Sequence, residues 1–260
     1  MQLAPSHSPI HRVQRLMGTV ISIDVRGESV SEKAVGVAFD YLLDIEARFS
    51  PFLEDSEISR ISRGELSMAD ASDDVRDVAV DCATFLADTA GAFDAWGHHA
   101  DRRFDPTGMV KGWALDRAAD VLIAAGARDL CINGGGDVIV RGEPEAGRSW
   151  KIGIRHPHLA DQIAATIELG NGAVATSAEY ERGAHIVDPR SGKRPEGLLS
   201  ATVVAETLAQ ADAYATAVFA MGNAGPSWAA CRDIALFAVT SDERVLTTQR
   251  MDRLLAISDG

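Results

Sequence analysis

Residues 129–141 read DLCINGGGDVIVR and decide the fold class of this chain. Two β-rich runs, Asp129–Asn133 and Val138–Arg141, stand on either side of three consecutive glycines. Glycine accepts the positive backbone φ that tight turns require, so this pattern indicates two strands joined by a short hairpin. The stretch therefore predicts strands that follow one another along the chain and pair directly.

Similar runs recur elsewhere and are interleaved with helical patterns. We expect further strands at Leu16–Val25, Trp150–Arg155, Ala164–Leu169, Ala173–Thr176, Ala201–Ala205, Ile234–Thr240 and Val245–Gln249. Apolar residues at helical spacing predict helices at Ala34–Arg48, Asp73–Thr89, Lys111–Ala125, Ala209–Met221 and Ser227–Arg232. Ser29 and Glu32 form a capping-box pattern ahead of the first helix. Because many strands neighbour each other through short turns, the order favours an α+β fold over a doubly wound parallel one. We therefore expect a mixed, largely antiparallel sheet packed with helices.

Bulk composition limits the classes of protein and partner. The chain has 260 residues, of which 46% are hydrophobic, and this is enough apolar material for a sizeable core. We expect a flexible tail over residues 1–12 and a single domain over residues 13–260. The formal net charge of -13 argues against a nucleic acid partner. A small polyanionic ligand stays compatible with this charge, because a metal ion can neutralise a phosphate locally.

The N-terminal residues and the cysteines bear on cellular location. The first twenty residues lack the apolar core of a signal peptide and a cysteine for lipid attachment. No run approaches the roughly 18 apolar residues of a membrane span. The sequence as written predicts a cytoplasmic protein, or an exported one if a leader was trimmed. Cys82, Cys131 and Cys231 are far apart without a CxxC pair, so we expect buried free thiols.

Small polar residues gather between Ala173 and Thr216, where packing alone would not place them. Asp212 and Thr216 lie four residues apart on an expected helix and so share one face. A carboxylate and a hydroxyl suit a hard cation such as Mg²⁺, with phosphate oxygens completing its ligands. The alternative is that Asp212 caps the helix and Thr216 bonds back to the Asp212 carbonyl.

Other polar positions allow a functional and a structural interpretation. The pair Thr176-Ser177 can meet a phosphate or form a turn. His185 can act as a general base or phosphate ligand, or be structural. The loop 105–112 can present backbone groups and Lys111 to a phosphate. Phe52, in an expected loop, can stack on a planar ring or close an edge of the core.

In their order along the chain, these segments resemble the ApbE family of flavin transferases, the FAD:protein FMN transferases. The resemblance runs from Met17 to about Gly222. Its blocks are Met17-Gly-Thr, Phe49-Ser-Pro-Phe52, Asp55–Arg60 (DSEISR), Gly91-Ala-Phe-Asp94, Asp105–Asp116 (DPTGMVKGWALD), Asn133–Asp137 (NGGGD), Ala175-Thr-Ser177, His185–Gly192 (HIVDPRSG) and Ala211–Thr216 (ADAYAT).

The resemblance implies an ApbE-like, T-fold-like architecture and a Mg²⁺-dependent transfer of FMN from FAD. The acceptor is a Thr or Ser hydroxyl of a target flavoprotein, and AMP is released. His185 is implied as the catalytic base, and the carbonyl of Gly108, Asp212 and Thr216 as the metal ligands. The implied FAD-binding residues are Met17, Phe52, Ala92, Phe93, Asp94, Asp105, Lys111, Thr176, Ser177 and Ile186.

The chain departs from the family pattern at several places. Ala178 replaces the glycine of the TSG block, Ser191 replaces a threonine, and Phe52 lacks the hydroxyl of the usual tyrosine. The segment after Asp94 is shortened. Two alternatives to transfer are left open: an FAD pyrophosphatase that uses water and gives FMN and AMP, and a flavin-binding protein without turnover.

Overall fold

A large antiparallel sheet forms the centre of the molecule. The computed structural model describes residues 9–27, 30–97, 103–159, 161–178 and 186–256. Eight strands pair in the order β1-β2-β3-β4-β7-β8-β9-β10, and every pairing is antiparallel. They are β1 Ile10–Leu16, β2 Thr19–Arg26, β3 Asp129–Gly134, β4 Asp137–Arg141, β7 Gly172–Ala178, β8 Leu198–Ala205, β9 Ala235–Thr240 and β10 Val245–Thr247. The remaining two strands, β5 Trp150–Arg155 and β6 Ile163–Leu169, form a separate antiparallel pair.

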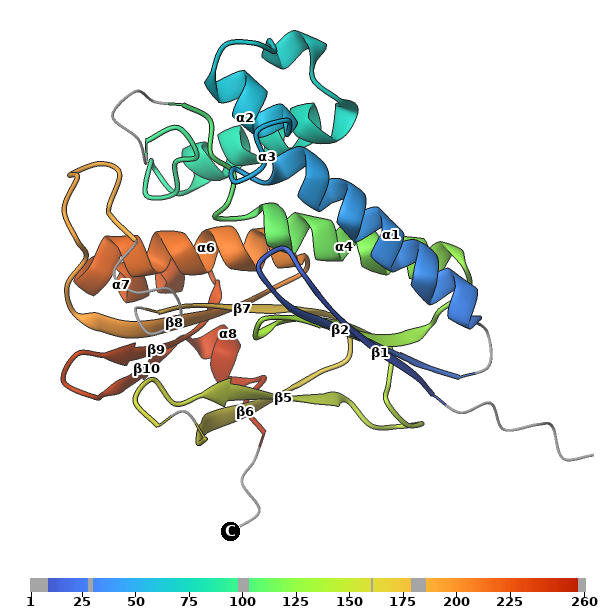
Figure 1. Ribbon diagram of the computed structural model, residues 1–260. Helices are drawn as coiled ribbons and strands as arrows, with labels where there is room; N and C mark the ends of the chain where they lie inside the picture. The colour runs from blue at the N-terminus through green and yellow to red at the C-terminus, as the bar shows by residue number, and fades with distance from the viewer. Residues whose placement is uncertain (1–8, 28–29, 98–102, 160, 179–185, 257–260) are drawn as a thin grey trace, which may run out of the picture.

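Helices cover one face of this sheet, and the β5–β6 pair with α8 covers the other (Figure 1). The helices are α1 Glu32–Phe49, α2 Glu57–Ser62, α3 Asp73–Asp88, α4 Val110–Ala124, α6 Leu208–Met221, α7 Gly225–Cys231 and α8 Gln249–Asp252, with short 3-10 turns at η1 Met68–Asp70 and η2 Gly222–Ala224. Helices α1, α4 and α6 form the layer next to the sheet, with α2 and α3 beyond them (Figure 1). The α+β prediction is therefore confirmed.

Two apolar clusters lie on the two faces of the sheet, because side chains alternate along a strand. Ile21, Ile23 and Ile132 point toward the helices and pack with α1, α4 and α6. Val138 and Phe237 point the other way, toward β5 and β6. The central strands β4, β7, β8 and β9 are thus buried on both faces, which fixes their register.

The strand expected at Leu16–Val25 is confirmed as β2, which begins three residues later at Thr19, but a further strand before it was not expected. Strand β1 begins at Ile10, inside the stretch expected to be a tail, and pairs with β2 through a turn at Met17 and Gly18. Both turn residues have positive φ, 53° and 71°, as a two-residue hairpin turn requires. Strand β1 lies at the edge of the sheet and carries alternating polar residues, so its apolar signal is weak.

Smaller corrections concern caps, a missed helix and a thiol. The side chain that caps α1 belongs to Ser31, which accepts from the Ala34 amide, and Ser29 lies outside the described residues. Helix α2 has only six residues, too few for a periodic pattern, and was not expected. All three cysteines are free, but only Cys82 is buried and Cys231 is exposed. No helix in the described ranges is long and apolar enough to cross a membrane.

Candidate functional site

Three charged side chains from three elements meet at one end of the sheet. Lys111 lies in the first turn of α4, Asp137 begins β4, and Asp212 lies in α6. The Lys111 ammonium forms an ion pair with the Asp137 carboxylate, and its Nζ lies 3.7 Å from Oδ2 of Asp212. All three side chains are at most 13% exposed. Charges that are this well buried interact through little water, so salt screens them weakly.

The close approach of α4 and α6 brings Lys111 to Asp212. A side chain at Gly112 would place its Cβ 2.7 Å from the carbonyl oxygen of Leu208, so only glycine fits without a shift. In an α-helix this carbonyl accepts the amide of the residue four positions on, which is Asp212. Gly112 therefore packs against the turn of α6 that carries Asp212.

Asp116, one turn further along α4, holds the beginning of α6. Its two carboxylate oxygens accept from the Leu208 amide at 2.8 Å and the Ala209 amide at 2.9 Å. Burial raises the pKa of Asp116 to about 6, although these two hydrogen bonds favour the charged form. The Thr207 hydroxyl caps the next amide, that of Gln210. The helix begins at Leu208, so the interpretation of Asp212 as its cap is wrong.

Two hydroxyl pairs extend the site along the end of β7. The Ser177 and Thr216 hydroxyl oxygens lie 3.3 Å apart, which places Thr216 on the face of α6 that meets the sheet. The Thr176 amide donates to the other oxygen of Asp137 at 3.1 Å, and its hydroxyl pairs with that of Thr202 at 2.9 Å. Both residues lie inside β7, so the interpretation of Thr176-Ser177 as a turn is wrong.

The segment 91–97 and the loop before α4 form the next part of the site. Ala92 and Phe93 are each 1% exposed, so both residues belong to the core. A Cβ at Gly108 would lie 3.2 Å from the Phe93 ring, which places this ring beneath the loop. The Asp105 amide donates to the Ala95 carbonyl, and the Asp105 carboxylate accepts from the Thr107 amide. These contacts hold the loop 105–109 against the segment 91–97.

The turn after Ile186 lies against the same segment. The Asp188 amide donates to the Lys193 carbonyl, and the Arg190 guanidinium binds the Asp188 carboxylate, with Nε 2.8 Å from Oδ1. This hydrogen bond holds the pKa of Asp188 below its usual range. A Cβ at Gly91 would lie 3.5 Å from Cγ of Arg190. Ile186 itself is half-buried against the core, and His185 lies outside the described residues.

Met17 and Phe52 are placed by other contacts. The Met17 amide donates to Oε1 of Glu46 on α1, and the Met17 side chain packs on the core. Phe52 follows α1 in a loop and is 92% exposed, so it does not close an edge of the core. Its exposure leaves the ring free to stack, but no described contact joins Met17 or Phe52 to the charged cluster.

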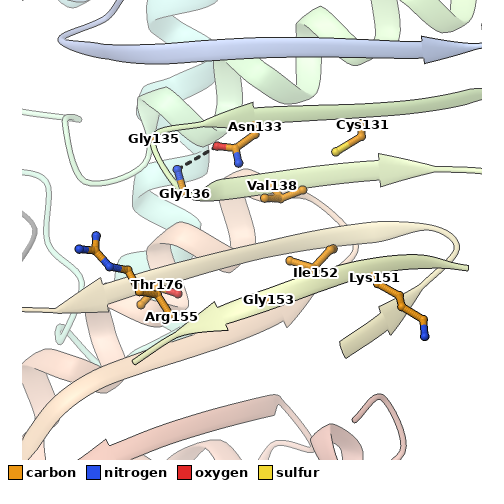
Figure 2. A pocket seen from close by; sticks show the side chains of 10 residues that line it. All are labelled: Cys131, Asn133, Gly135, Gly136, Val138, Lys151, Ile152, Gly153, Arg155 and Thr176. Carbon is orange, nitrogen blue, oxygen red and sulfur yellow. Dashed lines mark hydrogen bonds between the residues drawn. The ribbon is translucent and has the colours of Figure 1, made fainter. Parts of the chain in front are cut away.

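A cavity of about 300 Å³ lies on the other face of the sheet, between the sheet and the β5–β6 pair. Figure 2 shows it between strands β3, β4 and β7 and strand β5, with Asn133, Gly136, Thr176 and Arg155 at one end. The Asn133 side chain accepts from the Gly136 amide at 2.9 Å and so stabilises the β3–β4 hairpin. Thr176 lines the cavity, and its amide donates to Asp137 of the charged cluster.

The family model described as the ApbE family matches residues 17–99 and 96–238. This chain belongs to the ApbE family. It is 34% identical over 169 residues to an FAD:protein FMN transferase of Rhodobacter capsulatus, a match that covers 61% of this chain and 32% of the relative. It is 31% identical over 129 residues to the FAD:protein FMN transferase of Vibrio cholerae, which covers 46% of this chain and 39% of the relative. The matched part thus spans well under half the length of these curated relatives.

Solved structures of ApbE proteins share the fold. The flavin transferase ApbE from Vibrio cholerae superposes with a TM-score of 0.84 at 21% identity, over 95% of this chain and 99% of that one. The ApbE protein from Thermotoga maritima gives 0.84 at 23% identity, over 96% and 100%. At these identities the likeness establishes the architecture, and the ApbE-like fold expected from the sequence is confirmed.

Two acidic residues of the ApbE-family blocks were missed as site residues. Asp137 ends the NGGGD block, whose glycines indicate a hairpin and give no sign that the following carboxylate contributes to a site. Asp116 ends the DPTGMVKGWALD block and acts on a helix 92 residues away in sequence. The signal available in the sequence was their membership of these blocks, because neither contact has a local spacing pattern.

Proposed function

We propose that this protein transfers FMN from FAD to a Thr or Ser hydroxyl of an acceptor flavoprotein, and that Mg²⁺ is required. The observation that carries the proposal is the meeting of Lys111, Asp137 and Asp212 with the Ser177–Thr216 pair. These residues come from four separate blocks of the ApbE family. The relatives named FAD:protein FMN transferase supply the reaction.

The side chains on α6 fit a hard divalent cation in chemical type. Asp212 offers a carboxylate and Thr216 a hydroxyl on one face of the helix, and the Gly108 carbonyl is the proposed third ligand. Within the described residues, no three His, Cys, Asp or Glu side chains gather to hold a metal unaided. The proposed set therefore relies on phosphate oxygens or water for its remaining ligands, as Mg²⁺ sites commonly do.

The charge of the cluster agrees with this role. Lys111 lies between two carboxylates, so the three side chains together carry an excess of one negative charge when all are ionised. A bound divalent cation reverses that sign and makes the site attractive to a diphosphate. When bound, Mg²⁺ would neutralise charge on the FAD phosphates and hold them in place.

The proposed reaction exchanges one phosphorus–oxygen bond for another. The acceptor hydroxyl oxygen bonds to the phosphorus on the FMN side, and the bond from that phosphorus to the bridging oxygen breaks. FMN stays on the acceptor as a phosphoester, and AMP leaves. His185 would take the hydroxyl proton, and Lys111 would face the phosphates. Phe52 would stack on the isoalloxazine ring, while Ala92 to Asp94, with Asp105 and Ile186, would line the FAD site.

The test incubates the protein with FAD, Mg²⁺ and an apo acceptor domain, beside the same domain with its acceptor Thr changed to Val. We expect flavin fluorescence on the Thr acceptor after denaturing electrophoresis, an equal amount of AMP, and neither product with the Val acceptor. FMN and AMP formed without an acceptor would instead identify a pyrophosphatase. FAD binding without turnover would leave a binding protein, and the absence of FAD binding would overturn the proposal.

A further inference from the structure

Asp116 is a half-buried carboxylate that the proposed reaction does not use. It lies on α4 beyond Lys111 and accepts both the Leu208 and the Ala209 amide at the beginning of α6. The first amides of a helix have no acceptor within the helix, and here the acceptor comes from a different helix. Asp116 therefore links α4 to α6 by hydrogen bonds and also caps α6.

This link holds the turn of α6 that precedes Asp212, the predicted metal ligand. Asp212 lies four residues after Leu208, so the two share a helix face and a backbone hydrogen bond. Gly112 lets α4 contact the Leu208 carbonyl directly, and Asp116 accepts hydrogen bonds from the Leu208 and Ala209 amides. The axial position of α6 relative to Lys111 is thus set at two neighbouring points of α4.

We propose that Asp116 is a positioning residue for the cation-binding face of α6: its two hydrogen bonds fix where Asp212 and Thr216 stand relative to Lys111. The inference rests on the proposed function, since it assigns Mg²⁺ to that face. Partners that orient ligands without touching the metal commonly change metal affinity by about tenfold or more when altered. Asp116 would act in this way through the helix rather than through a side-chain contact.

The experiment compares the wild-type protein with Asp116→Asn by titrating Mg²⁺ calorimetrically in the presence of saturating FAD. Asparagine keeps the size of the side chain but replaces one acceptor oxygen with an NH2 donor, so one of the two amides loses the oxygen that it now binds. We expect about a tenfold weaker Mg²⁺ affinity and an unchanged affinity for FAD without Mg²⁺. Amide exchange, followed by NMR, should accelerate at Leu208 or Ala209.

The matched control is Asp120→Asn on the same helix, because Asp120 is exposed and pairs only loosely with Arg117. A second control, Thr207→Ala, removes the neighbouring cap and leaves the Asp116 contacts in place. Both should bind Mg²⁺ as the wild type does. Should Asp116→Asn not fold, Gly112→Ala tests the same contact between α4 and the first turn of α6, because the added Cβ would displace the Leu208 carbonyl.

The outcomes distinguish a failure of the Asp116 inference from a failure of the proposed function. If the wild type binds FAD and Mg²⁺ and Asp116→Asn binds Mg²⁺ equally well, Asp116 is only a structural cap and the inference is wrong. If Thr207→Ala weakens Mg²⁺ binding as much as Asp116→Asn, a loss of helix stability explains both and the inference again fails. If the wild type binds neither FAD nor Mg²⁺, the proposed function fails first.

Discussion

Nζ of Lys111 on α4 and Oδ2 of Asp212 on α6 lie 3.7 Å apart. Lys111 also forms an ion pair with Asp137 of β4, so one cation connects two helices and the central sheet. The contact has two consequences. It neutralises part of the charge that the predicted metal ligand brings into the protein, and it makes the stability of this region depend on Lys111.

We expect Lys111→Met to lower the free energy of unfolding by about 3 kcal/mol, because Asp137 loses its ion partner in a buried setting. Methionine keeps an unbranched stem of similar length, so the loss reports mainly on charge. Denaturant unfolding measures it. The matched control is Lys151→Met, whose exposed pair with Glu168 should contribute less than about 1 kcal/mol. Adding Asp137→Asn to Lys111→Met should recover part of the loss; a purely additive double variant would contradict the coupling.

Asp116 gives a stability that depends on pH in a defined direction. Its pKa in the folded protein is about 6, above the value of about 3.9 for an unfolded aspartate. The folded protein therefore holds this proton more tightly, and the contribution of Asp116 to stability falls as pH rises from about 4 to about 6, by up to about 3 kcal/mol. Above about pH 7, where Asp116 is ionised in both states, it is constant. Arg141 lowers this pKa and Asp120 raises it, so both belong to the same titration.

The measurement is the difference in unfolding free energy between wild type and Asp116→Asn across this pH range. Taking the difference removes the slopes of carboxylates such as Asp188, whose lowered pKa acts in the opposite direction. The unfolding free energy of the wild type minus that of Asp116→Asn should fall as pH rises. A difference that stays flat between pH 4 and pH 6 would show that Asp116 has an ordinary pKa.

Phe52 should affect ligand binding and leave stability unchanged. Its ring is 92% exposed, so Phe52→Ala removes little packing, and the unfolding free energy should change by less than about 0.5 kcal/mol. If the ring stacks on isoalloxazine, FAD affinity should fall by about five- to tenfold, and Phe52→Tyr should restore it. Quenching of flavin fluorescence measures both effects. Equal affinity in Phe52→Ala would remove this residue from the FAD site.

His185→Ala should slow transfer while FAD stays bound. A positioned base contributes about a hundredfold or more to such a step, so the transfer rate should fall by at least that factor. Rates with saturating FAD and acceptor, together with FAD titration, separate the step from binding. Ser191→Ala, in the nearby exposed turn, is the control. A rate in His185→Ala close to that of the wild type would show that another group takes the proton.

The sequence predicted most of the elements whose pattern is local. Helices α1, α3, α4 and α6 carry apolar stripes long enough to show helical spacing, and the strands flanking residues 134–136 are separated by glycines. Strand β1 was missed because an edge strand exposes one face and alternates polar with apolar residues. Helix α2 is too short to show a period.

The sequence predicted the site residues that lie together on one element, and it did not predict those that meet only when distant elements pack together. Asp212 and Thr216 stand one turn apart, so their shared face follows from helix geometry alone. Asp137 meets Lys111 across 26 residues and Thr176 across 39, contacts that only the folded sheet creates. The glycines before Asp137 predicted a hairpin correctly, and the same hairpin delivers the carboxylate to the site.

The most direct test of the account measures AMP released from FAD, with and without Mg²⁺, by the wild type and by Asp212→Ala in the presence of an acceptor. The wild type should release AMP only with Mg²⁺ and in amounts equal to acceptor-bound FMN. Asp212→Ala should stay folded and lose this Mg²⁺-dependent release. Turnover in Asp212→Ala equal to that of the wild type, or release by the wild type that ignores Mg²⁺, would contradict the account.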